Sequence, residues 1–227
     1  MSRTKLKDRQ LPNYTRNEEI ANMVTHIIGG GLGVVSLVLC SVFAAIYRNV
    51  WGLVGGTMYS MMMIFLYTMS SVYHGLKNEN AKKVMQVIDH CSIFALILGT
   101  YLPVLLTGVR KQSLPLFIIL CIIVFVGTIV GVTFTAIDFK KYAVISMTGY
   151  FAIGWAALLA LKPLYNQFGL EMILWLLAGG VAYTLGIIFF AIGTKREYFH
   201  TIFHLFILAG SILHFVAIFK FCILQFN

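Results

Sequence analysis

Long apolar stretches alternate with short polar segments along almost the whole chain. Seven stretches are free of Asp, Glu, Lys and Arg apart from one acid in the third, and each is long enough to cross a ~30 Å hydrocarbon core as a helix of about 20 residues. The alternation of a membrane β-barrel is absent. The pattern predicts an all-α bundle of seven transmembrane helices, at about residues 20–47, 50–76, 84–109, 112–137, 142–161, 171–194 and 198–222, behind a polar tail of residues 1–19.

Composition agrees with a multi-pass membrane protein. Of the 227 residues, 59% are hydrophobic and 11% are charged, and the mean hydropathy is +0.88. Soluble domains carry about 25% charged residues and cannot hide so much apolar side chain. These values exclude a soluble enzyme, a disordered chain and a disulfide scaffold. The cysteines show no CxxC spacing and are expected to be free thiols within or at the ends of helices: Cys40, Cys91, Cys121 and Cys222.

The net charge of +9 would suggest a nucleic-acid partner in a soluble protein. Here the basic residues lie between apolar stretches, so they indicate membrane orientation and no nucleic-acid binding. Twelve Lys and Arg residues fall on the side of the N-terminus and five on the other side. The positive-inside rule then predicts a cytoplasmic N-terminus and an outside C-terminus. The first helix is too long for a cleaved secretory signal and is expected to be a retained anchor in the cell membrane.

Polar residues inside the apolar stretches are the candidates for chemistry, because they are unfavourable there without a function or a partner. His200 and His204 are four residues apart and therefore share one face of the seventh helix. Ser70 and His74 have the same spacing at the end of the second helix. Asp89, near the start of the third helix, is the one acid inside an apolar stretch. The predicted topology places all five at one depth, near the cytoplasmic side.

Three imidazoles with an open fourth position, steered by a carboxylate, are typical of a catalytic zinc site. Other interpretations stay open for each part. His200 and His204 could form hydrogen bonds between helices, Asp89 could pair with Lys83, and Ser70 could bond back to a helix carbonyl. We expect His26 and Cys91 to lie beside the metal, with His26 alternatively a packing residue and Cys91 a remote fourth ligand. His90 and His214 are interpreted as packing residues.

Glycines and one proline also carry predictions about helix packing. Two glycine clusters, in the first and sixth predicted helices, favour close approach of backbones, although glycine is also common filler in membrane helices. Pro103 predicts a kink inside the third helix. The clusters are Gly29, Gly30, Gly31 and Gly33, and then Gly179 and Gly180.

Taken together, these motifs resemble those of the haemolysin III family, the bacterial branch of the progestin and adipoQ receptor group, which is related to alkaline ceramidases. The similarity spans nearly the whole chain, and only the combination of motifs is specific. One departure is Leu102, where a small polar residue is expected before the proline. The motifs are Asn22 to His26 with the following glycines, Ser70 to His74, Asp89–His90, Gly99 to Pro103, and His200 to His204.

The resemblance implies residue roles and a cytoplasmic N-terminus. It places zinc ligands at His74, His200 and His204, the carboxylate that holds the zinc-bound water at Asp89, and a serine beside the metal at Ser70. Our leading hypothesis is a zinc-dependent hydrolase of lipid amide or ester bonds, with a membrane lipid as substrate. The alternatives are a receptor or regulator of membrane homeostasis with structural zinc, and a haemolytic, pore-forming cytolysin. The sequence leaves the substrate and the oligomeric state open.

Overall fold

The computed structural model describes residues 4–193 and 196–224, and within them every regular element is helical. Seven helical spans of the described chain are long and apolar enough to cross a membrane, which confirms the predicted fold class. Four spans are single helices: α1 (Arg16–Ile46), α2 (Val50–Gly75), α5 (Leu114–Asp138) and α8 (Leu170–Ile192).

The other three spans are composite. The third joins α3 (Glu79–Val104), the π-helical turn η2 (Leu105–Val109) and α4 (Arg110–Gln112). The fifth joins α6 (Ala143–Trp155), the 3-10 turn η3 (Ala156–Ala160) and α7 (Leu161–Phe168). The seventh joins α9 (Phe199–Ala217) and the π-helical turn η4 (Ile218–Ile223). A short 3-10 turn, η1 (Leu6–Asp8), precedes α1.

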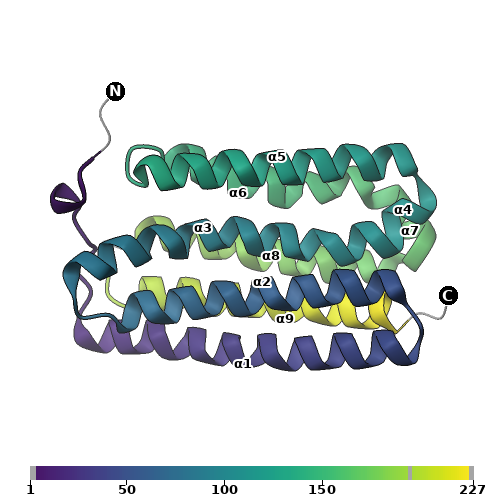
Figure 1. Cartoon of the computed structure of the whole chain (residues 1–227), viewed down its shortest axis with the longest axis horizontal. Coiled ribbons are helices and arrows are strands. Elements are labelled where there is room, and N and C mark those ends of the chain that lie inside the picture. Colours follow the sequence, from purple (N-terminus) through teal and green to yellow (C-terminus); the bar gives the residue numbers. More distant parts are fainter. Residues whose placement is uncertain (1–3, 194–195, 225–227) are drawn as a thin grey trace.

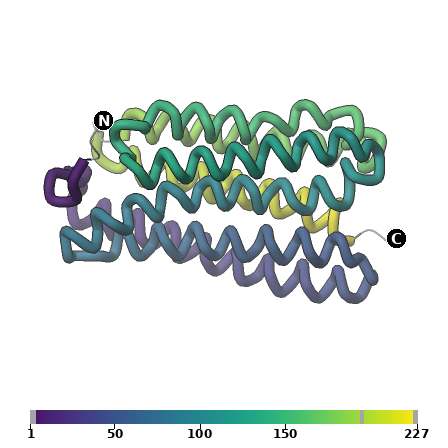
Figure 2. The backbone as a smooth tube through the Cα atoms, turned by 45° about the horizontal axis from the view of Figure 1, so that its top comes forward, coloured from purple at the N-terminus to yellow at the C-terminus, as the bar shows by residue number. Residues whose placement is uncertain are grey.

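Helices that follow one another in sequence lie side by side, running up and down the long axis of the molecule (Figure 1). α1 packs against α2, α2 against α3, α3 against α5, and α5 against α6, while α8 pairs with α9. α9 also packs against α1, which closes the bundle. The tilted view shows the same lengthwise arrangement of all the helices (Figure 2). The ends of α2, α3 and α9 that carry the candidate site therefore meet at one end of the bundle.

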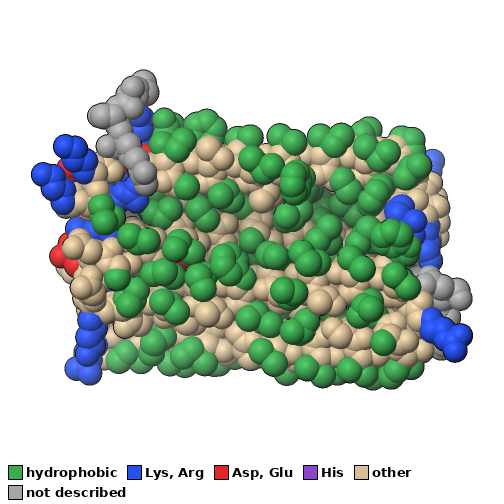
Figure 3. Space-filling model, in the orientation of Figure 1, with side chains coloured by type: hydrophobic (Ala, Val, Ile, Leu, Met, Phe, Trp, Pro, Cys, Tyr) green, Lys and Arg blue, Asp and Glu red, His purple; other side chains and the backbone are tan. Residues whose placement is uncertain are grey.

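The outer surface is suited to lipid. Hydrophobic side chains cover the sides of the molecule, and Lys and Arg gather at its two ends (Figure 3). Apolar side chains at this surface are stable in a hydrocarbon solvent, where every backbone polar group must be bonded within its helix. The protein is thus a multi-pass membrane protein. Strongly exposed examples on α1 and α5 are Ile27, Ile28, Val34, Ile118, Ile122 and Phe125.

Two helices begin earlier than the sequence predicted. α1 begins at Arg16 rather than residue 20, because Thr15 caps it and forms a capping box with Glu18. α3 begins at Glu79 rather than residue 84, because the side chain of Asn78 accepts a hydrogen bond from the Ala81 backbone. Both helices start with a turn that contains charged residues, so the charge-free stretch in the sequence begins later than the helix itself. Residues 16–19, placed in the polar tail by the sequence, are helical.

Some of the glycines predicted to allow close helix packing do so in the structure. A Cβ on Gly29 would clash with the ring of Tyr67, and one on Gly33 would lie 2.8 Å from Ile64, so these two glycines let α1 approach α2. A Cβ on Gly31 would meet no atom within 4 Å. Pro103 lies inside α3, where its missing N–H removes one helix hydrogen bond, and the helix continues from Leu105 as the π-helical turn η2.

Candidate metal centre

Three histidines meet at the end of the bundle that carries the N-terminal segment. His74 lies in the last turn of α2, and His200 and His204 lie in the first turns of α9; all three are buried. One ring nitrogen of each lies within 4.8 Å of those of the other two. The ring centroids are 5.3 Å apart for His74 and His200, 5.1 Å for His74 and His204, and 4.4 Å for His200 and His204. The structure therefore brings together the three residues predicted as metal ligands.

The hydrogen bonds of these rings fit a metal ion. Among the described residues, the buried Nε2 atoms of His74 and His200 have no hydrogen-bond partner. Orphaned buried nitrogens are rare and need an explanation. His204 turns Nδ1 toward α1, where the backbone of Asn22 and the hydroxyl of Thr25 at 3.4 Å lie. Neutral imidazole nitrogens are good zinc ligands. The buried group could hold a metal ion.

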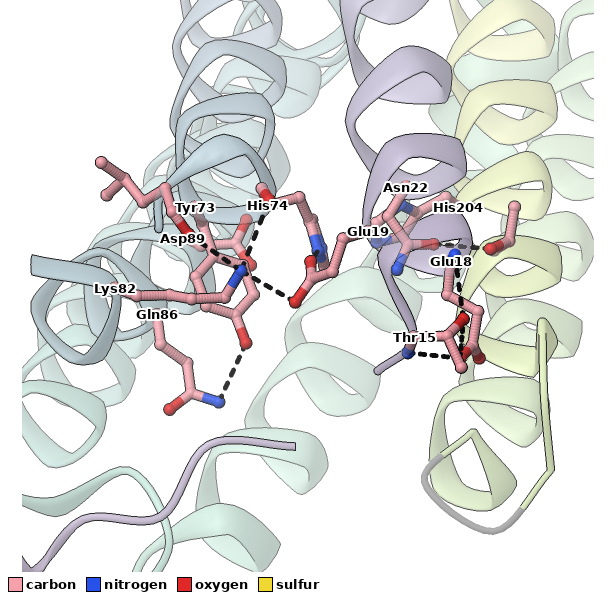
Figure 4. Close-up of polar contacts among 12 residues, drawn as sticks. Thr15, Glu18, Glu19, Asn22, Tyr73, His74, Lys82, Gln86, Asp89 and His204 are labelled. Carbon is pink, nitrogen blue, oxygen red and sulfur yellow. Dashed lines mark hydrogen bonds and ion pairs between the residues drawn. The ribbon is translucent and has the colours of Figure 1, made fainter. Parts of the chain in front are cut away.

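A carboxylate that the sequence interpretation missed lies behind His74. Glu19 of α1 is 2.7 Å from His74 Nδ1 through Oε2 and 2.8 Å from Lys82 Nζ through Oε1 (Figure 4). Lys82, in the first turn of α3, also donates to the carbonyl of His74 at 3.4 Å. The hydropathy pattern places residues 1–19 in a polar tail, where Glu19 does not stand out as a candidate. The sequence Thr15-Arg16-Asn17-Glu18 is the signal that could have extended the helix to include it.

Asp89 and Ser70 lie together on the side of the site that faces the cavity. The Ser70 side chain is within hydrogen-bonding reach of the Asp89 carboxyl group, and both residues line the same cavity as His200 and His204. Lys83, the alternative partner of Asp89, forms an ion pair with Glu79 at 2.5 Å. The arrangement leaves Asp89 without an ion-pair partner among the described lysines and arginines.

The two residues expected beside the metal lie in different places. His26 of α1 is in edge contact with His204, with ring centroids 3.9 Å apart, and neither of its ring nitrogens has a partner among the described residues. Cys91 instead faces α5, with Sγ 3.8 Å from the carbonyl oxygen of Val132, and is not among the residues that line the cavity. His90 bonds to the Gln86 carbonyl at 2.7 Å, and it also lines the cavity, with Nδ1 3.7 Å from Asp89 Oδ2.

The cavity has a volume of about 200 Å³ and runs from the histidines toward the opposite end of the bundle. It passes between α3, α6, α8 and α9, from the level of Asp89 to that of Val104, about 22 Å along a helix at 1.5 Å per residue. Its wall is apolar beyond the site, with side chains such as Ile97, Leu158 and Leu176. Among the described residues that line it, Asp89 is the one acid and none is a lysine or arginine. Such a space suits an uncharged hydrocarbon chain.

The segment before α1 covers the outer side of the histidines. The ring of Tyr14 stacks on His200, with centroids 5.0 Å apart and planes at 22°, and its centroid is 6.1 Å from that of His74. Burial, together with the negative charge of Glu19, raises the pKa of Tyr14 above its ordinary value, so the phenol stays neutral near neutral pH. The Thr4 backbone amide donates to Asp138 at 2.9 Å, which holds the start of the segment on α5.

The fold and the site together define a class: a multi-pass membrane protein of seven helices with a buried three-histidine group at one end. Within that class, the chain belongs to the haemolysin III-related family, whose model matches residues 14–215. The matched range includes every residue of the histidine group and also Glu19, Ser70 and Asp89. The resemblance seen in the sequence is therefore confirmed.

Three relatives show how far the similarity extends. The chain is 35% identical to Hemolysin-3 homolog of Bacillus subtilis over 210 residues, which cover 92% of this chain and 97% of that protein. It is 35% identical to Hemolysin-3 of Bacillus cereus over 201 residues, 88% of this chain and 90% of that one. It is 25% identical to human Monocyte to macrophage differentiation factor over 211 residues, which cover 90% of this chain and 84% of that protein.

Proposed function

We propose that the protein is a zinc-dependent hydrolase that cleaves amide or ester bonds of membrane lipids. The observation that carries the proposal is the position of the histidine group. Three buried imidazoles, two of them with orphaned nitrogens, lie close together, and His200 and His204 of this group line the polar end of a largely apolar cavity. Asp89 and Ser70 line that same end. A lipid chain in the cavity would place its polar linkage at this group of residues.

Each side chain of the site has a distinct role in the proposed reaction. Zinc, when held by His74, His200 and His204, supplies Lewis acidity that polarises a carbonyl and acidifies water. Asp89 accepts the proton of the attacking water and then delivers it to the leaving group, as a general base and acid. Ser70 orients the Asp89 carboxyl group and can donate a hydrogen bond to oxygen at the reacting carbon. The apolar wall holds the hydrocarbon chain and excludes bulk water.

A receptor or regulator with structural zinc is the main rival. Structural zinc sites are closed by four protein ligands. The group found among the described residues has three, and the Asp89 carboxyl group lies in the neighbouring cavity lining together with Ser70. A group of three histidine ligands favours catalysis over a structural role.

A cytolysin is the second rival, because two relatives carry haemolysin in their names. A pore needs a polar lumen. The cavity of this chain is apolar along most of its length, which favours a bound lipid chain over a water-filled path.

The first test measures zinc in the purified full chain in lipid nanodiscs. We expect bound zinc in the parent protein and its loss in His200→Ala, because His200 supplies one of the three converging nitrogens. His214→Gln is the matched control, since His214 is a buried histidine of the same helix outside the group. Unchanged zinc in His200→Ala, or equal loss in His214→Gln, contradicts the metal centre.

The second test follows product release from a panel of lipid amides and esters. We expect turnover by the parent protein and a loss of about 10²–10⁴-fold in Asp89→Asn, which removes the proton acceptor. Zinc content should stay unchanged in this variant. Absence of turnover with every lipid, together with dye leakage from vesicles that persists in His200→Ala, would favour the cytolysin.

A further inference from the structure

We infer that Glu19 is the positioning residue of the metal centre: it orients the His74 ring and directs its Nε2 into the site, while Lys82 holds Glu19 in place. The inference rests on the metal centre of the proposed function, although it does not depend on hydrolysis. It concerns a residue of the first turns of α1 that the sequence placed in the polar tail.

The two oxygens of Glu19 have different partners. Oε2 lies 2.7 Å from His74 Nδ1, and Oε1 lies 2.8 Å from Lys82 Nζ. Lys82 also donates to the carbonyls of His74 and Leu76, each at 3.4 Å, and its ammonium group lies 5.2 Å from the centre of the Tyr73 ring. The ends of α1, α2 and α3 are therefore joined at this carboxylate, so that it has little freedom to turn (Figure 4).

The chemistry of the pair determines which histidine nitrogen is available. An ionised carboxylate only accepts hydrogen bonds, so the nitrogen next to Glu19 must carry the proton. Nδ1 of His74 is then the donor, and Nε2 keeps its lone pair. That Nε2 atom is buried and has no partner among the described residues. A carboxylate behind a ligating imidazole fixes the ring and raises its basicity, and its loss usually weakens metal binding about 10- to 100-fold.

A simple ion pair at the surface does not account for Glu19. The neighbouring pair Glu79–Lys83 is of that kind, since its acid is 71% exposed. The Glu19 side chain is only 19% exposed, and it divides its oxygens between an imidazole and an ammonium group. Burying a carboxylate is unfavourable unless each oxygen is satisfied. The geometry thus assigns Glu19 to His74 as well as to Lys82.

The experiment measures metal affinity in the full chain in nanodiscs by competition with a zinc chelator of known affinity. Glu19→Ala is expected to weaken zinc binding about 10- to 100-fold. Glu19→Gln keeps an acceptor oxygen without the charge, and a smaller loss is expected. Lys82→Met removes the ammonium group but keeps the contact between Glu19 and His74, so affinity should stay closer to that of the parent.

Two acids serve as matched controls. Glu18 lies next to Glu19 in the first turn of α1. Its carboxylate accepts hydrogen bonds from the backbone amides of Thr15 and Tyr198 instead of contacting His74. Glu79 belongs to the exposed ion pair. Glu18→Gln and Glu79→Gln should each leave zinc affinity unchanged. The visible absorption of the Co²⁺-loaded protein adds a readout of ligand geometry, and we expect the bands to shift in Glu19→Ala but not in the controls.

The outcomes separate this inference from the proposed function. Parent-like affinity and Co²⁺ bands in Glu19→Ala overturn it, as does a loss in Glu18→Gln or Glu79→Gln as large as that in Glu19→Ala. If Glu19→Ala does not fold, Glu19→Gln decides in the same way. A parent protein without histidine-dependent zinc overturns both the metal centre and the role of Glu19. If the parent protein binds zinc but hydrolyses no lipid, only the proposed hydrolase function is overturned, because zinc affinity is measured without turnover.

Discussion

Unsatisfied polar atoms concentrate at one place in this protein. Seven buried side-chain nitrogen and oxygen atoms lack a hydrogen-bond partner among the described residues, and five of them belong to Asn22, His26, His74 and His200. In an apolar medium such atoms are unfavourable, and structures retain them chiefly where a ligand or ion completes them. At the residue scale, the histidine nitrogens without hydrogen-bond partners therefore indicate the site as clearly as the spacing of the histidines does.

Tyr14 gives a prediction at this scale. Its ring stacks on His200 and lies over the outer side of the group, so it should slow the access of water and chelators. Tyr14→Ala is expected to release zinc to a chelator several-fold faster than the parent, with Tyr14→Phe close to the parent because the stacked ring is kept. Release rates are followed after addition of excess chelator to the loaded protein. Equal rates in all three proteins would show that the ring does not shield the site.

At the element scale, small residues decide how closely the helices pack. Gly55 of α2 faces Pro103 of α3, and a Cβ built on Gly55 would lie 2.5 Å from the Cα of Pro103. That atom belongs to the backbone, which cannot move away as a flexible side chain can. The contact lies far along α3 from Asp89, so it supports the bundle rather than the metal centre.

Gly55→Val should therefore destabilise the bundle by about 1–3 kcal/mol through overpacking. Gly31→Val is the matched control, because Gly31 of α1 is exposed and its Cβ would meet no atom within 4 Å. The measurement is the thermal unfolding temperature of each purified variant in the same detergent. If Gly55→Val unfolds at the same temperature as Gly31→Val, close packing of α2 against α3 at Gly55 does not contribute to the stability of the bundle.

At the scale of the whole molecule, the Lys and Arg residues on the face shown in Figure 3 gather at the two ends, with an apolar surface between them. Basic residues at the end opposite the metal centre are fewer: Arg48, Arg110, Lys111, Lys162 and Lys220. The end that carries the histidines has the excess of Lys and Arg, which the positive-inside rule assigns to the cytoplasm. The candidate site would then open toward the cytoplasmic leaflet.

Orientation is tested with reporters fused after Asn227. A reporter that is active only outside the cytoplasm should be active there, whereas one that works only in the cytoplasm should be silent. A second fusion, in the loop between α2 and α3, should behave in the opposite way, because that loop lies at the end of the histidines. A cytoplasmic C-terminus would contradict the predicted orientation and place the candidate site at the outer leaflet instead of the cytoplasmic one.

Much of the site could be predicted because membrane helices contain so few polar residues. His200 and His204 stand out by their spacing, and Asp89 as the one acid within an apolar stretch. Glu19 could not be found in that way, since it lies beside Arg16 and Glu18 in a segment that looks like a tail. Cys91 follows Asp89 by two residues, yet the helix rotates it by about 200° and it faces α5 instead.

The sequence by itself determined the class of fold, the number of spans and the three histidines, because hydrophobic length and helical spacing are local properties. Only the tertiary structure decided which polar groups meet. The contact of Glu19 with His74 joins residues 55 positions apart, and that of Thr201 with Asn22 joins residues 179 positions apart. The rotation of each helix about its axis sets such contacts, and that rotation depends on packing against every neighbour at once.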